Sequence, residues 1–350
     1  MMNKTGIAIS LRRAGLAALI AVALIAVQAC GKSNDGGKEA AKPAAGGSAA
    51  AESPYANVPK TLTYGYIGTN ELNLPGGPEG WGIYKGIIQD ELKKYGIEEV
   101  KTVGFPNGPD QTEALISGRL DFGSLGDTPA ILARSSGAKT RLITQQVTDL
   151  VGYLIGKKDG PKTLQDLEGK TIAIQKGSYM HRYVVGLLND AGVKNVKYVH
   201  MLRPDGEAAL ARGKVDAITN SGVPSLKLLD QGFPLLDDSS KHPELLGTST
   251  TVVSEAYLAK FPDFPKIWNE ARQKALEDLK QHEDEYYEFL AKVNNSTPEL
   301  VKQVSPISQN KDVPFTDEGL KRLGGTKDFL VKEKLATNDF DISDWVLKQP

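Results

Sequence analysis

Residues 113–130 read Glu-Ala-Leu-Ile-Ser-Gly-Arg-Leu-Asp-Phe-Gly-Ser-Leu-Gly-Asp-Thr-Pro-Ala, and residues 207–225 read Glu-Ala-Ala-Leu-Ala-Arg-Gly-Lys-Val-Asp-Ala-Ile-Thr-Asn-Ser-Gly-Val-Pro-Ser. Each stretch combines a short helical pattern, a Gly-basic-apolar-Asp turn, a short strand, a polar loop with Gly and a Pro that can open a helix. The turn glycines Gly118 and Gly213 lie 95 positions apart. Two similar α/β halves that each end a strand in a polar loop predict two lobes facing one cleft, a shape suited to a small ligand.

Strand and helix patterns alternate on both sides of this repeat. Strands are expected over 61–67, 99–105, 120–124, 140–146, 171–174, 196–201, 215–219 and 233–236. Residues 151–156 are expected to lead into the second lobe, and the character of the chain changes after 248–253. A helical pattern covers 81–95, and charged helical patterns cover 262–300 and 316–336. Strands that alternate with helices predict largely parallel, doubly wound sheets. We therefore expect an α/β chain with two lobes and a helical C-terminal part.

The order of the patterns also predicts how the lobes are divided. The first lobe is expected to contain residues 60–150 and 252–350, and the second lobe residues 151–251. A helical tail that returns to the first lobe requires two crossing segments, near 148–152 and 246–254. Two crossing segments form a hinge between the lobes.

The N-terminus resembles a secretory signal peptide. Basic residues at positions 4, 12 and 13 precede an uncharged run over 14–27, which is too short for a transmembrane helix. Cys30 is the only cysteine and follows small residues, so we expect residues 1–29 to be removed and Cys30 to carry the lipid of a bacterial lipoprotein. Ordinary cleavage beside an incidental cysteine is the alternative. The small and polar residues of 30–59 predict a flexible tether, so the body would be held at an extracytoplasmic or periplasmic membrane face.

Composition and motifs exclude several classes of function. Removing residues 1–29 leaves a formal charge of about −4, which argues against nucleic-acid binding. A body without cysteine has neither a cysteine nucleophile nor a thiolate metal site. The four histidines lack the spacing of a helical metal motif, and no G-x-S-x-G elbow or Walker A loop is present. We therefore expect a binding protein, with no enzyme activity, no cofactor and no metal.

Polar, glycine-containing loops follow the predicted strands. In open parallel sheets, ligands bind beyond the carboxyl ends of the strands, where helices begin. Several helix N-termini aimed at one point favour an anion, because their N–H groups are unpaired and carry partial positive charge. The loops in question span residues 69–81, 106–109, 124–129, 175–181 and 220–224.

The loop at 124–129 provides candidate ligand contacts from the first lobe. Gly126 lets the backbone approach a ligand closely. Thr128 precedes Pro129, so it either caps the following helix or donates its hydroxyl to a ligand. Asp127 either caps that helix or braces the loop, because a carboxylate placed directly against an anion would repel it. Trp81, after the first loop, either stacks on the ligand or belongs to the core.

The second lobe offers matching candidates in the loops at 175–181 and 220–224. Gly177 and Ser178 would present an amide and a hydroxyl at a helix N-terminus. His181 either contacts the ligand or is a local hydrogen-bond partner. Tyr179 would cover the apolar part of the ligand or lie outside the cleft. Asn220 stands where the repeat places the ligand loop of the first lobe, so it is a candidate donor.

These motifs together resemble a known family. Pro106-Asn-Gly-Pro109, the stretch 113–129, and 166–178 followed by His181 are similar to the nitrate/sulfonate/taurine group of substrate-binding proteins of ABC transporters, nearest to its aliphatic-sulfonate-binding members. The likeness extends over nearly all of 60–350. It implies the bilobal type II periplasmic-binding-protein-like fold, and a monomer that captures a small anionic ligand such as a sulfonate. Delivery to a membrane permease with a cytoplasmic ATPase is implied as well.

By position, the resemblance assigns Gly126, Asp127 and Thr128 to the ligand loop of the first lobe. It assigns Gly177, Ser178 and His181 to that of the second lobe. Two features depart from the family pattern. Residues 220–224 lack the Trp and the Asp-Pro pair of many sulfonate-binding relatives, and the first loop is lengthened by Pro75-Gly-Gly-Pro78.

Because both departures concern ligand-facing loops, several ligands stay open: a sulfonate, taurine, nitrate, a thiamine-precursor pyrimidine, or an aromatic acid or sulfonate. A related enzyme of this fold makes the thiamine pyrimidine but needs a cysteine-rich motif, which this chain lacks. A sensory lipoprotein without a permease is the remaining alternative.

Overall fold

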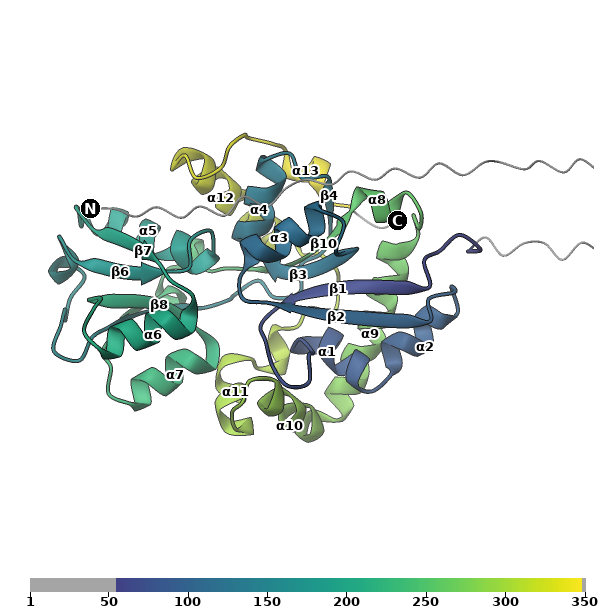
Figure 1. Cartoon of the computed structure of the whole chain (residues 1–350), viewed down its shortest axis with the longest axis horizontal. Helices are drawn as coiled ribbons and strands as arrows, with labels where there is room; N and C mark the ends of the chain where they lie inside the picture. Colours follow the sequence, from purple (N-terminus) through teal and green to yellow (C-terminus); the bar gives the residue numbers. More distant parts are fainter. Residues whose placement is uncertain (1–54, 348–350) are drawn as a thin grey trace, which may run out of the picture. The chain divides into compact units, whose positions relative to one another are not determined.

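The computed structural model describes residues 55–347, so the expected signal peptide, Cys30 and most of the tether lie outside the described residues. Two five-stranded sheets organise the described chain (Figure 1). The first sheet has the order β2-β1-β3-β10-β4 and consists of β1 (Thr61–Ile67), β2 (Glu99–Phe105), β3 (Phe122–Gly126), β4 (Thr140–Thr144) and β10 (Ser249–Ser254). The second has the order β7-β6-β8-β5-β9 and consists of β5 (Gly152–Gly156), β6 (Thr171–Ile174), β7 (Lys197–His200), β8 (Ala217–Ser221) and β9 (Leu235–Asp238).

In each sheet, one strand is antiparallel in direction to the other four. β1 is parallel to β2 and β3, whereas β10 is antiparallel to β3 and β4. In the second sheet β6 is parallel to β7 and β8, and β5 is antiparallel to β8 and β9. The reversed strand is in both cases the first strand after the chain has crossed from the other sheet. The expectation of largely parallel sheets is thus confirmed, with one exception in each lobe.

Helices cover both faces of the first sheet because its strands alternate apolar side chains between the two faces. Val253 packs in the core against α1 (Gly77–Tyr84), α2 (Ile87–Lys93) and α9 (Phe264–Gln281). Its neighbour Val252 packs on the opposite face, with α3 (Gly108–Ile116), α4 (Asp127–Ser135), α12 (Asp317–Lys332) and α13 (Ile342–Trp345). The short α8 (Glu255–Leu258) follows β10.

The second sheet is doubly wound in the same way. Leu154 and Ile172 pack against α5 (Tyr179–Asp190) on one face. Ile155 and Ala173 pack against α6 (Arg203–Ala211) and α7 (Gly222–Asp230) on the other. The remaining helices, α10 (Glu283–Val293) and α11 (Pro298–Val304), follow α9, so the predicted helical C-terminal part is confirmed.

Two crossing segments join the sheets and pair with each other. Leu150 and Gly247 exchange two backbone hydrogen bonds of 2.8 and 2.9 Å, and the N–H of Ser249 donates to the carbonyl of Val147 at 2.7 Å. The segments therefore form a short antiparallel ladder between the lobes. This arrangement confirms the predicted fold class of two α/β lobes joined by two crossings.

The repeated turn has the same structure in both lobes. Gly118 and Gly213 both adopt a positive φ, of 74° and 66°. The carboxylate of Asp121 accepts from the N–H of Thr63 at 2.7 Å, and that of Asp216 accepts from the N–H of Thr171 at 2.9 Å. In each lobe the aspartate thus ties the start of one parallel strand to its neighbour, β3 to β1 and β8 to β6, which explains the fixed spacing in the motif.

The expectation of a single helix over 81–95 is wrong, because the chain forms the two helices α1 and α2. Gly86 separates them with φ of 79°, a left-handed conformation that interrupts the helix. Apolar spacing alone did not reveal the break, since Ile83, Ile88 and Leu92 are buried on the same side of the sheet.

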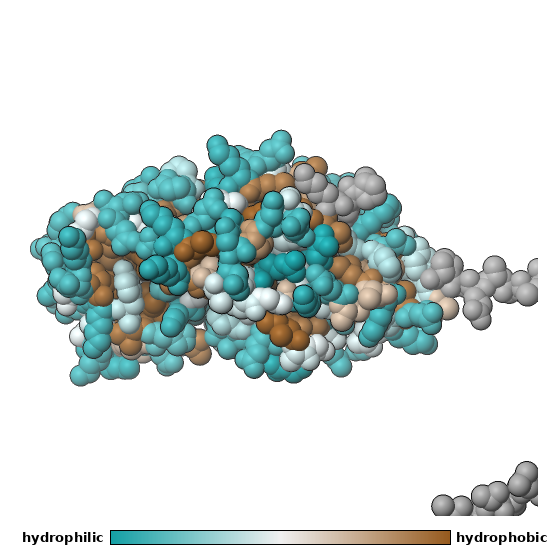
Figure 2. Space-filling view, turned by 90° about the horizontal axis from the view of Figure 1, so that it is seen from above, coloured by the Kyte–Doolittle hydropathy of each residue, from teal (hydrophilic) through white to brown (hydrophobic). Residues whose placement is uncertain are grey.

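The surface agrees with a chain that folds around internal cores. On the face shown in Figure 2, hydrophilic residues predominate and hydrophobic residues form small, separate areas. Within residues 55–347, none of the helices combines the length and the apolar character that crossing a membrane requires.

Candidate ligand-binding cleft

Six helices begin at the wall of one cavity of about 1170 Å³ between the two sheets. Each of them follows the carboxyl end of a strand, so the residue that precedes its first turn lies at the same edge of the sheet. The N-cap residues of α1, α3, α4, α5, α6 and α7 all line the cavity: Gly76, Asn107, Gly126, Ser178, Leu202 and Ser221. Each helix N-terminus contributes a partial positive charge to the cavity wall.

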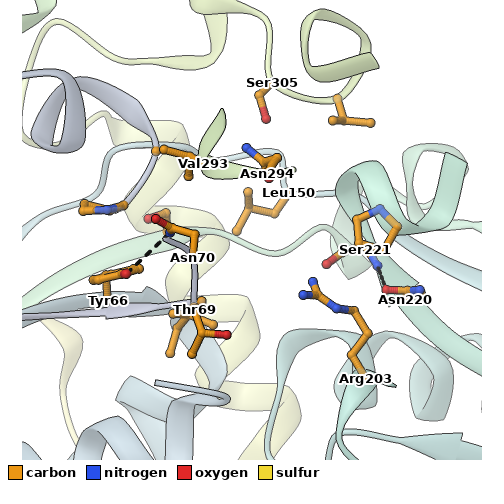
Figure 3. Close-up of a pocket in the computed structure, with 18 of the residues that line it drawn as sticks. Tyr66, Thr69, Asn70, Leu150, Arg203, Asn220, Ser221, Val293, Asn294 and Ser305 are labelled. Atoms are coloured by element: carbon orange, nitrogen blue, oxygen red, sulfur yellow. Dashed lines mark hydrogen bonds between the residues drawn. The ribbon is translucent and has the colours of Figure 1, made fainter. Parts of the chain in front are cut away.

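All five loops predicted to contact a ligand contribute to this wall. Figure 3 shows the first-lobe residues Tyr66, Thr69 and Asn70 facing the second-lobe residues Asn220, Ser221 and Arg203. The amide of Asn70 donates to the carbonyl of Leu74 at 2.8 Å, which shapes the first loop. The cavity therefore takes polar groups from both lobes.

The second-lobe wall is built around Asn220, which is buried and lines the cavity. Its amide nitrogen donates to Glu207 at 2.8 Å, and its amide oxygen accepts from the N–H of Ser221 at 2.9 Å. The ring of Tyr179 lies against the backbone of Gly247, where an added Cβ would come within 2.5 Å of it. Burial raises the pKa of Tyr179 to about 12, so its phenol stays neutral at ordinary pH.

A buried network supports the first-lobe wall. Glu79 lines the cavity and is 3% exposed, and its carboxylate accepts from the Nε of Arg272 at 2.7 Å. The amide of Gln146 donates to the same carboxylate and also to the hydroxyl of Thr251, at 2.8 Å in the second case. Arg272 itself lies behind the wall. The negative charge of Glu79 is therefore balanced within the protein.

Asp127 and Thr128 do not line the cavity. α4 begins at Asp127, after the N-cap Gly126, so Thr128 lies in the first turn and does not cap the helix. Both side chains are almost fully buried, and the hydroxyl of Thr128 donates to Asp127 at 2.9 Å. Of the alternatives for Asp127, the bracing role has the structural support.

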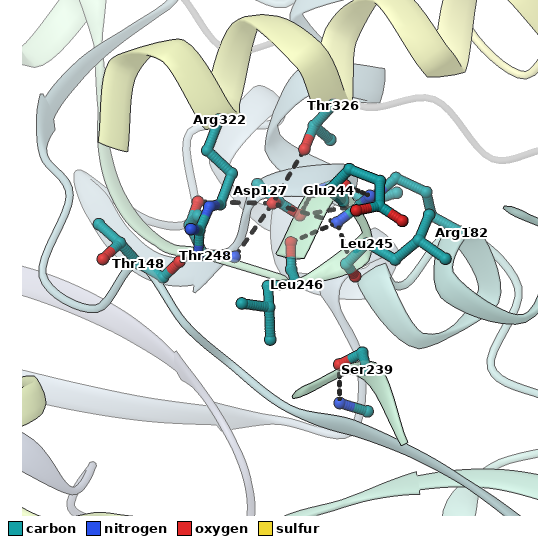
Figure 4. Close-up of polar contacts among 12 residues, drawn as sticks. Asp127, Thr148, Arg182, Ser239, Glu244, Leu245, Leu246, Thr248, Arg322 and Thr326 are labelled. Carbon is teal, nitrogen blue, oxygen red and sulfur yellow. Dashed lines mark hydrogen bonds and ion pairs between the residues drawn. The ribbon is translucent and has the colours of Figure 1, made fainter. Parts of the chain in front are cut away.

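Asp127 lies in a polar cluster between the lobes (Figure 4). Its carboxylate accepts from the N–H of Thr248 at 3.0 Å and forms an ion pair of 3.9 Å with Arg182 of α5. The guanidinium of Arg182 also donates to three successive carbonyls, of Glu244, Leu245 and Leu246. This cluster holds the second crossing segment in place.

Of the four candidates in the loop at 175–181, Ser178 and Tyr179 line the cavity. The hydroxyl of Ser178 caps α5 by accepting from the N–H of His181 at 3.1 Å. Gly177 adopts φ of 80° and donates its N–H to the Nδ1 of His181 at 3.3 Å. The structure thus gives His181 a local hydrogen-bonding role behind the loop.

The buried position of His181 makes a pH-dependent prediction. Burial, with a smaller effect of the nearby Lys176, lowers the pKa of His181 to about 4. The pKa of a histidine in the unfolded chain is about 6.5. Between about pH 6.5 and 4, the unfolded chain therefore binds a proton at this residue and the folded chain does not. The stabilisation is present above about pH 6.5 and is lost as the pH falls toward 4, by about 3 kcal/mol in total.

The test compares urea unfolding of wild type and His181→Asn across this range, because the asparagine oxygen can replace Nδ1 as acceptor. We expect the free energy of unfolding to fall less steeply with acid in the variant. Identical slopes would show that folding does not lower the pKa of His181.

Trp81 lies away from the cavity, in the core between α1, α9 and α10. Its side chain is fully buried, and its indole N–H donates to Asp278 at 2.7 Å. It packs in one cluster with Leu276, Tyr286 and Phe289. Of the two roles considered for Trp81, ligand stacking and core packing, its position supports core packing.

The cavity is also lined by polar residues that were absent from the sequence-based candidates, among them Gln146, Arg203 and Glu207. Arg203 and Glu207 follow β7, so extending the same loop rule to residues 201–207 would have included them. Gln146 comes from a crossing segment, and no sequence pattern marks it as ligand-facing.

The chain is similar to known proteins over most of its length. A Bacillus subtilis protein named as a binding protein for aliphatic sulfonates is 28% identical over 271 residues, which cover 75% of this chain and 80% of the relative. Among solved structures, the alkanesulfonate-binding protein of Xanthomonas axonopodis pv. citri bound to MOPS superposes with a TM-score of 0.69 at 22% identity, and the match covers 83% of this chain and 99% of that one.

The same fold also occurs in an enzyme. The desulfurization enzyme DszB matches with a TM-score of 0.61 at 18% identity, over 83% of this chain and 97% of that one. These two structural matches establish the periplasmic-binding-protein fold and leave the activity open.

The model of the family described as NMT1/THI5 like matches residues 86–286, which include both ligand loops, both crossing segments and the whole second sheet. The chain belongs to the NMT1/THI5-like family.

Proposed function

We propose that this protein is the solute-binding component of an ABC importer, and that it captures a small anionic organic ligand of the aliphatic-sulfonate kind. The observation that carries the proposal is the convergence of six helix N-termini on one inter-lobe cavity. Such an arrangement favours an anion, since the unpaired N–H groups of the first turns can donate to it. The sulfonate-binding names of the relatives support the choice of ligand class.

The lobes, taken as 60–150 with 252–350 and as 151–251, would close around the ligand by rotation at the paired crossing segments. Closure would exclude water and strengthen the hydrogen bonds to the ligand. Gly126, Ser178 and Asn220 would contact the ligand directly, and Tyr179 would cover its apolar part. Asp127, Thr128, Gly177 and His181 would act behind these contacts, and Trp81 would support the first loop from the core.

The closed complex would dock on a membrane permease with a cytoplasmic ATPase. A lipid on Cys30, outside the described residues, would hold the monomeric protein at the extracytoplasmic membrane face. Acyl chains on Cys30 in the intact mass of the membrane-bound protein would be direct evidence for this anchor, and an unmodified N-terminus would contradict it.

The ligand class is tested by thermal unfolding of the full chain in detergent with hexanesulfonate, taurine, nitrate, benzenesulfonate, benzoate and an aminopyrimidine. A ligand present at 100 times its Kd stabilises the folded state by about 2.7 kcal/mol, which raises the Tm measurably. We expect the organic sulfonates to raise the Tm clearly more than hexanesulfonamide, their uncharged analogue. If only the aminopyrimidine raises the Tm, the proposed ligand class is wrong. If none of the compounds raises the Tm, the binding function is contradicted.

A further inference from the structure

The two lobes repeat each other without a gap from α3 to the start of β4. α3 (Gly108–Ile116) matches α6 (Arg203–Ala211), β3 matches β8, and α4 (Asp127–Ser135) matches α7 (Gly222–Asp230), each pair being 95 positions apart. Every residue of the first-lobe wall in this region therefore has a definite counterpart in the second lobe. A difference between counterparts marks a place where the two ends of the cavity differ chemically.

The largest such difference is between Gly108 and Arg203. Both are the first residue of their helix, and both precede Pro and Asp. At Gly108 no side chain fits, because an added Cβ would lie 2.3 Å from the Cγ of Pro129. At Arg203 the equivalent position carries a long cation that lines the cavity, and Figure 3 shows its guanidinium pointing into the space between the lobes.

Among residues 55–347, the guanidinium of Arg203 has no hydrogen-bond or ion-pair partner, although Glu207 lies one turn further along the same helix. The carboxylate of Glu207 is instead engaged by the amide of Asn220 at 2.8 Å. Arg203 is thus free to bind an incoming group.

The other charges on the cavity wall are mostly engaged. Glu79 is paired with Arg272, and Lys227 donates to the backbone carbonyl of Asn295 at 2.8 Å. Lys292, on α10, is the remaining lining cation outside such contacts in the described part of the chain. Apolar side chains of the first loop and of the C-terminal helices also line the cavity: Leu74, Leu290, Val293 and Val304. Figure 3 shows Val293 across the space from Arg203.

We propose that Arg203 fixes the orientation of the ligand by binding its anionic group at the second-lobe end of the cavity. The inference rests on the proposed function and deepens it. The planar guanidinium can donate two parallel hydrogen bonds to two oxygens of one sulfonate. The body of the ligand then extends toward the apolar wall of the first lobe and the C-terminal helices, so the site selects an anionic head with an apolar tail.

The test is isothermal titration of the full-length protein and its variants with hexanesulfonate and with uncharged hexanesulfonamide. Arg203→Gln should weaken hexanesulfonate binding by about 10- to 100-fold, as expected for the loss of a charged hydrogen-bond donor. Arg203→Lys should recover part of the affinity. The matched control is Arg212→Gln, which removes an exposed arginine from the other end of α6 and should leave the affinity unchanged.

A structural role for Arg203 would weaken both ligands equally, whereas the proposed role reduces the preference for the sulfonate over the sulfonamide. If Arg203→Gln keeps wild-type affinity, or if Lys292→Gln causes the larger loss, this assignment is overturned while the proposed function stands. If the wild-type protein binds no anionic ligand at all, the proposed function itself fails.

Discussion

Replacing Arg182 by methionine is expected to lower the free energy of unfolding by about 3–5 kcal/mol, the usual cost of removing one partner of a buried ion pair. Arg182 is 1% exposed, and its partner Asp127 is fully buried. The substitution leaves the carboxylate of Asp127 without its counter-charge. It also removes the donors of three carbonyls in the second crossing segment.

Urea unfolding at pH 7, followed by circular dichroism, measures this effect. The control is the double variant Arg182→Met with Asp127→Asn, which removes the uncompensated charge and keeps an acceptor for the N–H of Thr248. We expect the double variant to be more stable than Arg182→Met alone. A loss below about 1 kcal/mol in the single variant would mean that the pair contributes no more than an exposed one.

Replacing Arg272 by methionine is expected to weaken anion binding strongly, although Arg272 lies behind the cavity wall. The variant leaves Glu79 as an uncompensated carboxylate at a wall that would face the anion. Juxtaposed like charges cost several kcal/mol, so the Kd for hexanesulfonate should rise by about 100-fold or more. Stability should fall by about 3–5 kcal/mol for the same reason as at Arg182.

The affinity is measured by titration at a temperature where the variant is still folded, which separates binding from stability. The matched control combines Arg272→Met with Glu79→Gln, so that the arginine is still missing but the carboxylate is gone. Recovery of binding in this double variant is the expected result. An equal loss of affinity for hexanesulfonate in both variants would show that Arg272 acts through the shape of the cavity wall and not through its charge.

Most strands were predictable because each is a short apolar run bounded by turn residues. β1, β2 and β6 begin and end where the alternation predicted, and the repeat identified both left-handed turn glycines. The reversal of β5 and β10 was not predictable, since strand direction depends on the path between sheets and not on local pattern. Gly86 illustrates a related limit, because a glycine inside a helical pattern is compatible with either continuation or a break.

The loops that line the cavity were predictable, whereas the individual side chains that line it were less so. Ser178 and Asn220 line the cavity because they lie at helix starts, as the loop rule requires. Asp127 and Thr128 occupy the same loop, yet they point inward, because buried Arg182 comes from the other lobe to pair with Asp127. Which of two neighbouring polar residues faces a ligand is decided by such long-range partners.

The position of β10 in the first sheet also determines the order in which the two sheets can be completed during synthesis. β4 pairs through its whole length only with β10 among the described strands, and β10 ends at Ser254. The second sheet, in contrast, is complete once Asp238 has emerged. The lobe that is synthesised first is therefore the last to close its sheet. As the chain emerges from its N-terminus, the second lobe can already be folded when β10 is made. Until β10 inserts between β3 and β4, those two strands of residues 61–144 lack the partner that joins them.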